Sequence, residues 1–194
     1  TGESHVMLAL KSGKAIRFEE AKTRPMGRNA SGVRGIRLQD EKTDEVIGMI
    51  AVDDMESNIL VVSENGYGKR SSLEDYRITN RGGKGVKTIS ITEKTGNLVS
   101  IKNVTDEDDL MIINKSGIAI RMAVADLRVM GRATQGVKLI NLKGNDSIAA
   151  VAKVMKDDEE DIEDIEGELI EDNVTDNEDS NEGGTAIDNN ETEN

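Results

Sequence analysis

The chain has 194 residues, which is enough for one domain and a tail. It contains no cysteine and one histidine, His5, so a disulfide framework, a thiolate metal site and a histidine cluster are excluded. We therefore expect a reducing, cytosolic environment. No apolar run approaches the roughly 18 residues of a membrane span, and no signal peptide is recognisable. The sequence opens at Thr1 on a strand-like run without an initiator Met, so we expect a piece of a longer protein.

The formal net charge of −13 is unevenly distributed along the chain. All 25 lysines and arginines lie at or before Lys156, together with 20 of the 38 acidic residues, which leaves this part at +5. Residues 157–194 hold the other 18 acidic residues and no basic one. The sequence thus predicts a mildly basic folded body that carries an acidic tail.

Up to residue 156 the chain consists of three similar units, at about 1–53, 54–105 and 106–156. Each begins with a short apolar run, too short for a helix, that predicts a buried strand. These runs are Val6 to Leu10, Ile59 to Ser63 and Leu110 to Asn114. A turn containing glycine follows and predicts a hairpin. The return strands are Lys14 to Phe18, Tyr67 to Ser71 and Ile118 to Met122.

A loop with an arginine and a glycine follows each return strand and leads into a short alternating run, which predicts a third strand. These segments are Met26 to Leu38, Thr79 to Ile91 and Met130 to Leu142. A fourth apolar segment ends each unit, at Val46 to Val52, Leu98 to Val104 and Ser147 to Val154. Four short strands in about fifty residues are typical of propeller blades, so we expect an all-β fold with blades of about four antiparallel strands.

Basic residues recur at equivalent positions of the three units. Alternation along the return strands places one column on the face opposite the apolar residues, where we expect solvent. The predicted DNA-binding residues are Arg17, Arg70 and Arg121 in this first column, Arg28, Arg81 and Arg132 in a second, Arg34, Lys87 and Lys138 in a third, and Lys84. A radial arrangement would turn the columns into rows that follow a phosphate backbone, whereas a single surface lysine is ordinarily only solvated.

A glycine precedes the valine of each loop segment, at Gly32, Gly85 and Gly136. Glycine there suits a turn with positive φ that enters the strand. It would also allow the backbone to approach phosphates closely, and the two interpretations are compatible.

The segment from Asp157 to Asn194 is rich in Asp, Glu, Asn, Gly and Thr, with only isolated apolar residues. Such a composition buries too little apolar surface to offset the cost of ordering the backbone. We therefore predict a disordered acidic tail. A tail of this charge would either compete with DNA for the basic body or simply promote solubility.

Three motifs resemble one known family. They are G-V-R-G-I-R-L at 32–38, N-G-Y-G-K-R at 65–70 and V-M-G-R-A-T-Q-G-V at 129–137. In this order they resemble the last three blades of the C-terminal domain of DNA gyrase A subunits. The resemblance covers residues 1–156 and implies a β-pinwheel, a propeller-like disc whose basic rim wraps double-stranded DNA.

The resemblance also implies a parent enzyme, a bacterial type II topoisomerase that uses ATP and Mg²⁺ to introduce negative supercoils. The partners would be the gyrase B subunit, together with the remainder of the gyrase A subunit, in a heterotetramer at the nucleoid. Cleavage in this family uses a tyrosine beside an arginine in a helical domain, which neither Tyr67 nor Tyr76 resembles. We thus predict no catalytic residue, metal site or cofactor within this chain.

Two alternatives remain open at this point. One is the C-terminal domain of the topoisomerase IV A subunit, because the glycine-rich basic box that marks gyrase is altered here. T-N-R-G-G-K-G at 79–85 has Thr79 and Asn80 where the box Q-R-R-G-G-K-G has Gln and Arg. The other is a propeller-like protein-interaction module. Aromatic residues, which are enriched in protein interfaces, are few here, and this disfavours the module.

Overall fold

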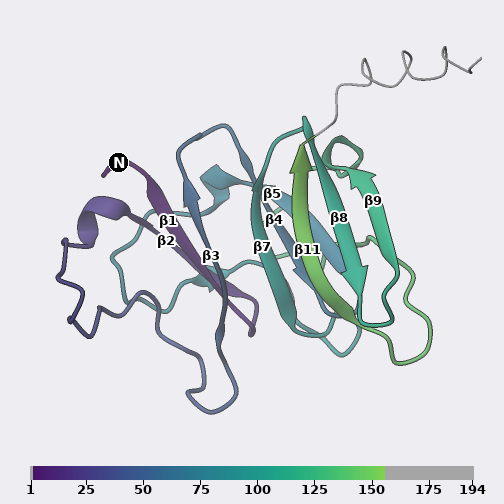
Figure 1. Ribbon diagram of the computed structural model, residues 1–194, viewed down its shortest axis with the longest axis horizontal. Helices are drawn as coiled ribbons and strands as arrows, with labels where there is room; N and C mark the ends of the chain where they lie inside the picture. The colour runs from purple at the N-terminus through teal and green to yellow at the C-terminus, as the bar shows by residue number, and fades with distance from the viewer. Residues whose placement is uncertain (1, 156–194) are drawn as a thin grey trace, which may run out of the picture. The chain divides into compact units, whose positions relative to one another are not determined.

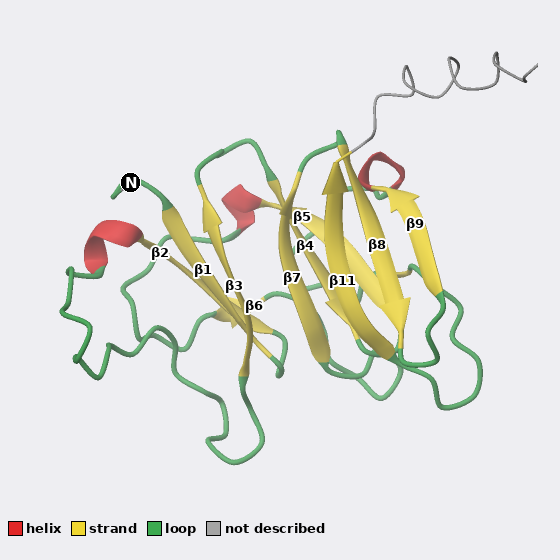
Figure 2. Ribbon diagram, viewed as in Figure 1, coloured by secondary structure: helices red, strands yellow, loops and turns green. Residues whose placement is uncertain are grey.

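The computed structural model describes residues 2–155, and within them the fold is built from strands and three short 3₁₀ turns (Figure 1). The strands form three antiparallel sheets that follow one another along the chain (Figure 2). The predicted all-β class is therefore confirmed. The predicted tail at 157–194 lies outside the described residues.

The first two sheets have four strands each and the third has three. In spatial order the first contains β3 (Val46–Val52), β1 (His5–Leu10), β2 (Lys14–Glu19) and β6 (Val86–Lys87). The second contains β10 (Val137–Lys138), β5 (Tyr67–Ser72), β4 (Asn58–Ser63) and β7 (Leu98–Val104). The third contains β11 (Ile148–Met155), β8 (Asp108–Asn114) and β9 (Ala119–Ala123). A 3₁₀ turn follows each return strand: η1 (Glu20–Lys22), η2 (Leu73–Asp75) and η3 (Val124–Asp126).

The fourth strand of a sheet comes from the next unit of the chain. In the first sheet Val86 of β6 lies opposite Ala15 of β2. In the second, Val137 of β10 lies opposite Gly68 of β5, at the equivalent position. The predicted blades of about four antiparallel strands are thus confirmed, although the first and second sheets each take one strand from the next unit. Alternation assigns a residue to a face of a strand but does not identify the strand with which it pairs.

The expected strand at 33–38 does not form, and the third strands of the other two units are only two residues long. The reason is that the third strand of a unit pairs with the return strand of the unit before it, as β6 and β10 do. A donated strand needs the return strand of a preceding unit, and within residues 2–155 no unit precedes β1.

The core lies between the sheets, and β4 contributes to it from both faces. Ile59 and Val61 pack with residues of the first two sheets, such as Met7. The alternate residues Leu60 and Val62 pack with the third sheet. A strand covered on both faces appears in sequence as a continuous apolar run, as this one does. Each sheet is therefore buried by its neighbours rather than by its own unit.

Two glycines make the contact between units close. Gly85 and Gly136 have positive φ, and a Cβ atom on either would lie 2.6 Å from a carbonyl oxygen of the preceding return strand, at Ala15 or Gly68. Contacts below 3.0 Å are essentially never seen for real Cβ atoms. The predicted positive-φ turn is confirmed here. The structure adds a second reason for glycine, which is the approach of one backbone to another.

Replacing Gly136 by Ala should destabilise the fold more than replacing Gly144, whose φ is also positive but whose Cβ would meet no atom within 4 Å. Left-handed backbone costs an alanine about 1–2 kcal/mol at either site. The clash of the added Cβ atom with the backbone oxygen of Gly68 lowers the stability further, and only at Gly136. Urea unfolding of both variants measures the difference, and equal losses would show that the close approach is unimportant.

Candidate nucleic-acid interface

The structure divides the predicted basic residues into those that join units and those that face solvent. Arg17 belongs to the first kind, with only 7% of its surface exposed. Its Nη1 donates hydrogen bonds to the backbone oxygens of Leu73, at 2.9 Å, and Tyr76, at 3.3 Å, around η2 of the next unit. Its Nε donates to Nδ1 of His5 at 2.8 Å.

Arg70 repeats this arrangement one unit later. It is 6% exposed, donates from Nε to the backbone oxygen of Leu127 after η3, and forms an ion pair with Asp106. The prediction that the first column lies on a solvent-facing rim is therefore wrong for Arg17 and Arg70. The 3₁₀ turn of the following unit covers the face that alternation alone assigns to solvent.

Arg121 is the third member of this column and is exposed. Its Nε donates to Oδ2 of Asp109 at 2.7 Å, on the neighbouring strand β8. No unit follows β9 within residues 2–155 to cover this side chain.

The second column joins units in the opposite direction. Arg81 donates to the backbone oxygen of Arg34 at 2.5 Å, in the preceding unit. Arg132 makes the equivalent bond to the backbone oxygen of Lys87 and donates to that of Asp75 at 3.1 Å. Both are half-buried, whereas Arg28 is exposed. Arg81 and Arg132 therefore hold the donated segments in place through these hydrogen bonds.

The third column lies on the surface as predicted. In β6 and β10 the valines, Val86 and Val137, are half-buried, and the adjacent lysines, Lys87 and Lys138, are exposed. Both strands form the outer edge of their sheets. Arg34 and Lys84 are exposed as well. The sheet edges thus present lysines at equivalent positions in successive units.

Lys69 was not identified as a functional residue from the sequence. It is buried and binds the backbone of the loop that precedes β10. It is 1% exposed, and its Nζ donates to Oγ of Ser71 at 2.7 Å and to the backbone oxygens of Gly131, at 2.9 Å, and Arg132, at 2.6 Å. Burial lowers the pKa of Lys69 to about 8. The signal in the sequence is a break in the repeat, because the equivalent position in the first unit is the buried Ile16.

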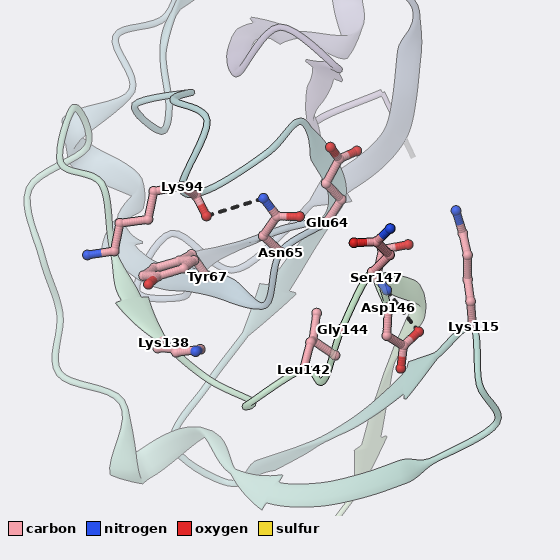
Figure 3. A pocket seen from close by; sticks show the side chains of 11 residues that line it. Glu64, Asn65, Tyr67, Lys94, Lys115, Lys138, Leu142, Gly144, Asp146 and Ser147 are labelled. Atoms are coloured by element: carbon pink, nitrogen blue, oxygen red, sulfur yellow. Dashed lines mark hydrogen bonds between the residues drawn. The ribbon is translucent and has the colours of Figure 1, made fainter.

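A cavity of about 580 Å³ adjoins the outer edge of the second sheet. Figure 3 shows the ring of Tyr67 between the side chains of Lys94 and Lys138, with Nζ of Lys94 lying 5.3 Å from the ring centroid. Glu64 and Asp146 line its other side. A hydrogen bond from Ser116 keeps the pKa of Asp146 below its usual value. The mixed charge of the cavity does not by itself define an anion site.

Among residues 2–155 no group of three or more His, Asp or Glu side chains is arranged to hold a metal ion. The same residues contain no helix that is long and apolar enough to cross a membrane.

Strand donation between successive sheets, with a lysine at each donated position, defines a propeller-like domain with a basic edge. The sequence profile of the DNA gyrase C-terminal domain, beta-propeller, matches residues 5–53, 57–105 and 108–155. The chain belongs to this family.

Curated relatives include the DNA gyrase A subunit of Staphylococcus aureus strain MRSA252, which is 46% identical over 89% of this chain and 19% of the relative. The chain thus spans about a fifth of the length of such relatives. Among solved structures, a DNA gyrase A C-terminal domain superposes with a TM-score of 0.71 at 27% identity, over 79% of this chain and 51% of that one. The C-terminal domain of a DNA topoisomerase IV gives 0.74 at 21% identity, over 79% and 47%, which shows a common fold.

Replacing Arg17 by Met should lower the free energy of unfolding by about 2–4 kcal/mol. Hydrogen bonds to a charged group contribute about 1.5–3 kcal/mol each, and the substitution leaves the carbonyls of Leu73 and Tyr76 without this donor. The control is Arg28→Met, an exposed arginine, for which we expect a change within about 0.5 kcal/mol. Similar losses in chemical denaturation would contradict the joining role of Arg17.

Lys69 should make stability rise between about pH 8 and pH 10. Its pKa is about 8 in the folded chain and 10.5 when unperturbed, so in this range the unfolded chain binds the proton that the folded chain has lost. Above this range Tyr76 opposes the rise, because burial raises its pKa from 10.0 to about 12. Denaturation over this pH range should show the rise in Lys87→Met and lose it in Lys69→Met. Parallel curves of stability against pH for the two variants would refute the assignment of this rise to Lys69.

Proposed function

We propose that the chain binds and wraps double-stranded DNA along the outer edges of its sheets. The observation that carries this proposal is the equivalent placement of Lys87 and Lys138 on donated strands of successive units, each exposed beside a half-buried valine. Lysines repeated along one edge suit the regular spacing of phosphates in a duplex. Membership of the gyrase C-terminal domain family supports the same function.

Among the second and third columns and Lys84, the solvent-exposed basic residues are Arg28, Arg34, Lys84, Lys87 and Lys138. We propose these as phosphate contacts, with half-buried Arg81 and Arg132 positioning the loops that carry them. Contacts from lysine and arginine to phosphate carry no sequence information, so binding should tolerate any sequence and weaken steeply with salt.

For the whole protein we propose the A subunit of DNA gyrase, a type II topoisomerase that introduces negative supercoils. The support is 46% identity to a gyrase A subunit over 89% of this chain. The gyrase B subunit would be its partner, ATP and Mg²⁺ would act in other parts of the enzyme, and the complex would work in the bacterial cytoplasm at the nucleoid. A topoisomerase IV subunit has weaker support, because that likeness, at 21% identity, concerns the fold.

Replacing Lys87 or Lys138 by Ala should weaken duplex binding equally for unrelated sequences. Each substitution should lower the slope of log affinity against log salt by about 0.9, the value for one phosphate contact. The matched control is Lys102→Ala, because Lys102 lies on β7 at the opposite edge of the second sheet. Its slope should stay at the wild-type value.

Fluorescence anisotropy at several salt concentrations measures these slopes, and nuclease protection measures the wrapped length. Unchanged slopes for both edge lysines would refute the proposed contacts. Loss of slope in the Lys102 variant alone would place DNA on the other edge. Absence of any salt-dependent duplex binding would instead favour a protein-interaction module.

A further inference from the structure

The outer edges of the first two sheets differ at one position of the cross-strand pairing. In the first sheet, Lys14 of β2 lies directly opposite Lys87 of β6. In the second sheet, the equivalent pair is Tyr67 of β5 and Lys138 of β10. Residues directly opposite in an antiparallel pair share one face of the sheet. The first sheet therefore presents two lysines at this position, whereas the second presents one lysine and an aromatic ring.

A second lysine reaches this position of the second sheet from a loop. Nζ of Lys94 lies 5.3 Å from the centroid of the Tyr67 ring, and Figure 3 shows the ring between Lys94 and Lys138. The face of an aromatic ring attracts an ammonium group, so this contact keeps Lys94 at the edge of the sheet. Each of the two sheets thus has two lysines at its outer edge, although they come from different positions in the two units.

The loop that carries Lys94 is fixed by the hairpin turn of the same unit. The side-chain amide of Asn65 donates hydrogen bonds to the backbone oxygens of Glu93, at 3.1 Å, and Lys94, at 3.3 Å. The backbone N–H of Asn65 donates to the backbone oxygen of the fully buried Thr95. The fold therefore places Lys94 over the ring, and the flexible side chain does not have to find this position by itself.

These lysines have no acidic partner in the described part of the chain. Within residues 2–155 no ion pair involves Lys14, Lys87, Lys94 or Lys138. Like charges directly opposite each other destabilise a sheet. The pairing of Lys14 with Lys87 therefore costs stability, and a bound anion would remove this cost.

The acidic residues that line the cavity beside Tyr67 are bound to other groups. Nδ2 of Asn97 donates to Glu64 at 3.3 Å, and Oγ of Ser116 donates to Asp146 at 2.8 Å. Neither carboxylate forms an ion pair with a lysine of this edge among residues 2–155. Their negative charge repels phosphate, so a duplex would lie on the lysine side of the ring.

We propose that Lys14 and Lys94 contact phosphates together with Lys87 and Lys138, so that each of the two outer edges binds the duplex through a pair of lysines. Tyr67 acts as a positioning residue, because its ring holds Lys94 where the first sheet has Lys14. This inference rests on the proposed DNA binding and adds two contacts to it. Each added contact would release further counterions and make binding more sensitive to salt.

Replacing Lys14 or Lys94 by Ala should lower the slope of log affinity against log salt by about 0.9, the value for one phosphate contact. The matched control is Lys42→Ala, because E-K-T at 41–43 repeats E-K-T at 93–95 and Lys42 is also exposed. Its slope should stay at the wild-type value. A fall in the Lys42 variant as large as that in the Lys94 variant would overturn the inference.

A rescue experiment tests whether the two arrangements are equivalent. In the Lys94→Ala chain, the second substitution Tyr67→Lys places a lysine opposite Lys138, as Lys14 lies opposite Lys87 in the first sheet. The slope should return to the wild-type value. Tyr67→Gln in the same Lys94→Ala chain should not restore it. Equal slopes for these two double variants would contradict the equivalence.

Lysine acylation with and without a DNA duplex, read by mass spectrometry, tests the contacts without any substitution. DNA should protect Lys14 and Lys94 and leave Lys42 reactive. Equal protection of all three would overturn the inference. If only Lys87→Ala and Lys138→Ala lower the salt slope, the inference fails and the proposed function stands. If none of these lysines affects the slope, both fail.

Discussion

The close contact between a glycine loop and the return strand of the preceding unit is the interaction on which the rest of this structure depends. Gly85 and Gly136 let one backbone lie against another, and only then can the following valine reach the sheet edge. Because the fourth strand of the first and of the second sheet comes from the next unit, neither of these sheets is completed by its own unit. Stability in such an array is shared between neighbours, as in other repeat proteins.

The types of basic residue follow from this arrangement. Arginine occupies the contacts between units, where Arg17 and Arg70 each reach backbone oxygens of the following 3₁₀ turn. Its planar guanidinium offers several donors in fixed directions and keeps its charge when buried, which suits it to this position. Lysine occupies the outer edge at Lys87 and Lys138, where a mobile point charge on a solvated stem needs no fixed geometry. The buried Lys69 is the exception, and burial accordingly lowers its pKa.

The sequence predicted the first, second and fourth strands of each unit well, because their signals are local, whereas the third strands are absent or only two residues long. The bounds of β3 and β7 coincide with the apolar segments 46–52 and 98–104, and the hairpin glycines lie where the turns were expected. Strand exchange was not predictable from periodicity, which carries no information on pairing partners. Periodicity also does not show which element covers a strand face. Arg17 and Arg70 were therefore predicted to be exposed, although the 3₁₀ turn of the following unit covers them. The exposed lysines were predicted because no element covers them in the described residues.

Strand donation also links the candidate DNA surface to the packing between units. Lys87 and Lys138 belong to the unit that donates the strand, yet they are displayed on the sheet of the preceding unit. The spacing between successive lysines is therefore set by how one unit sits on the next, through the same glycines and buried arginines that stabilise the array. A duplex bound along these edges would contact several units at once, so its curvature would follow the rotation from unit to unit. Residues at the contacts between units, such as Arg70 and Gly136, would then influence wrapping by fixing that rotation.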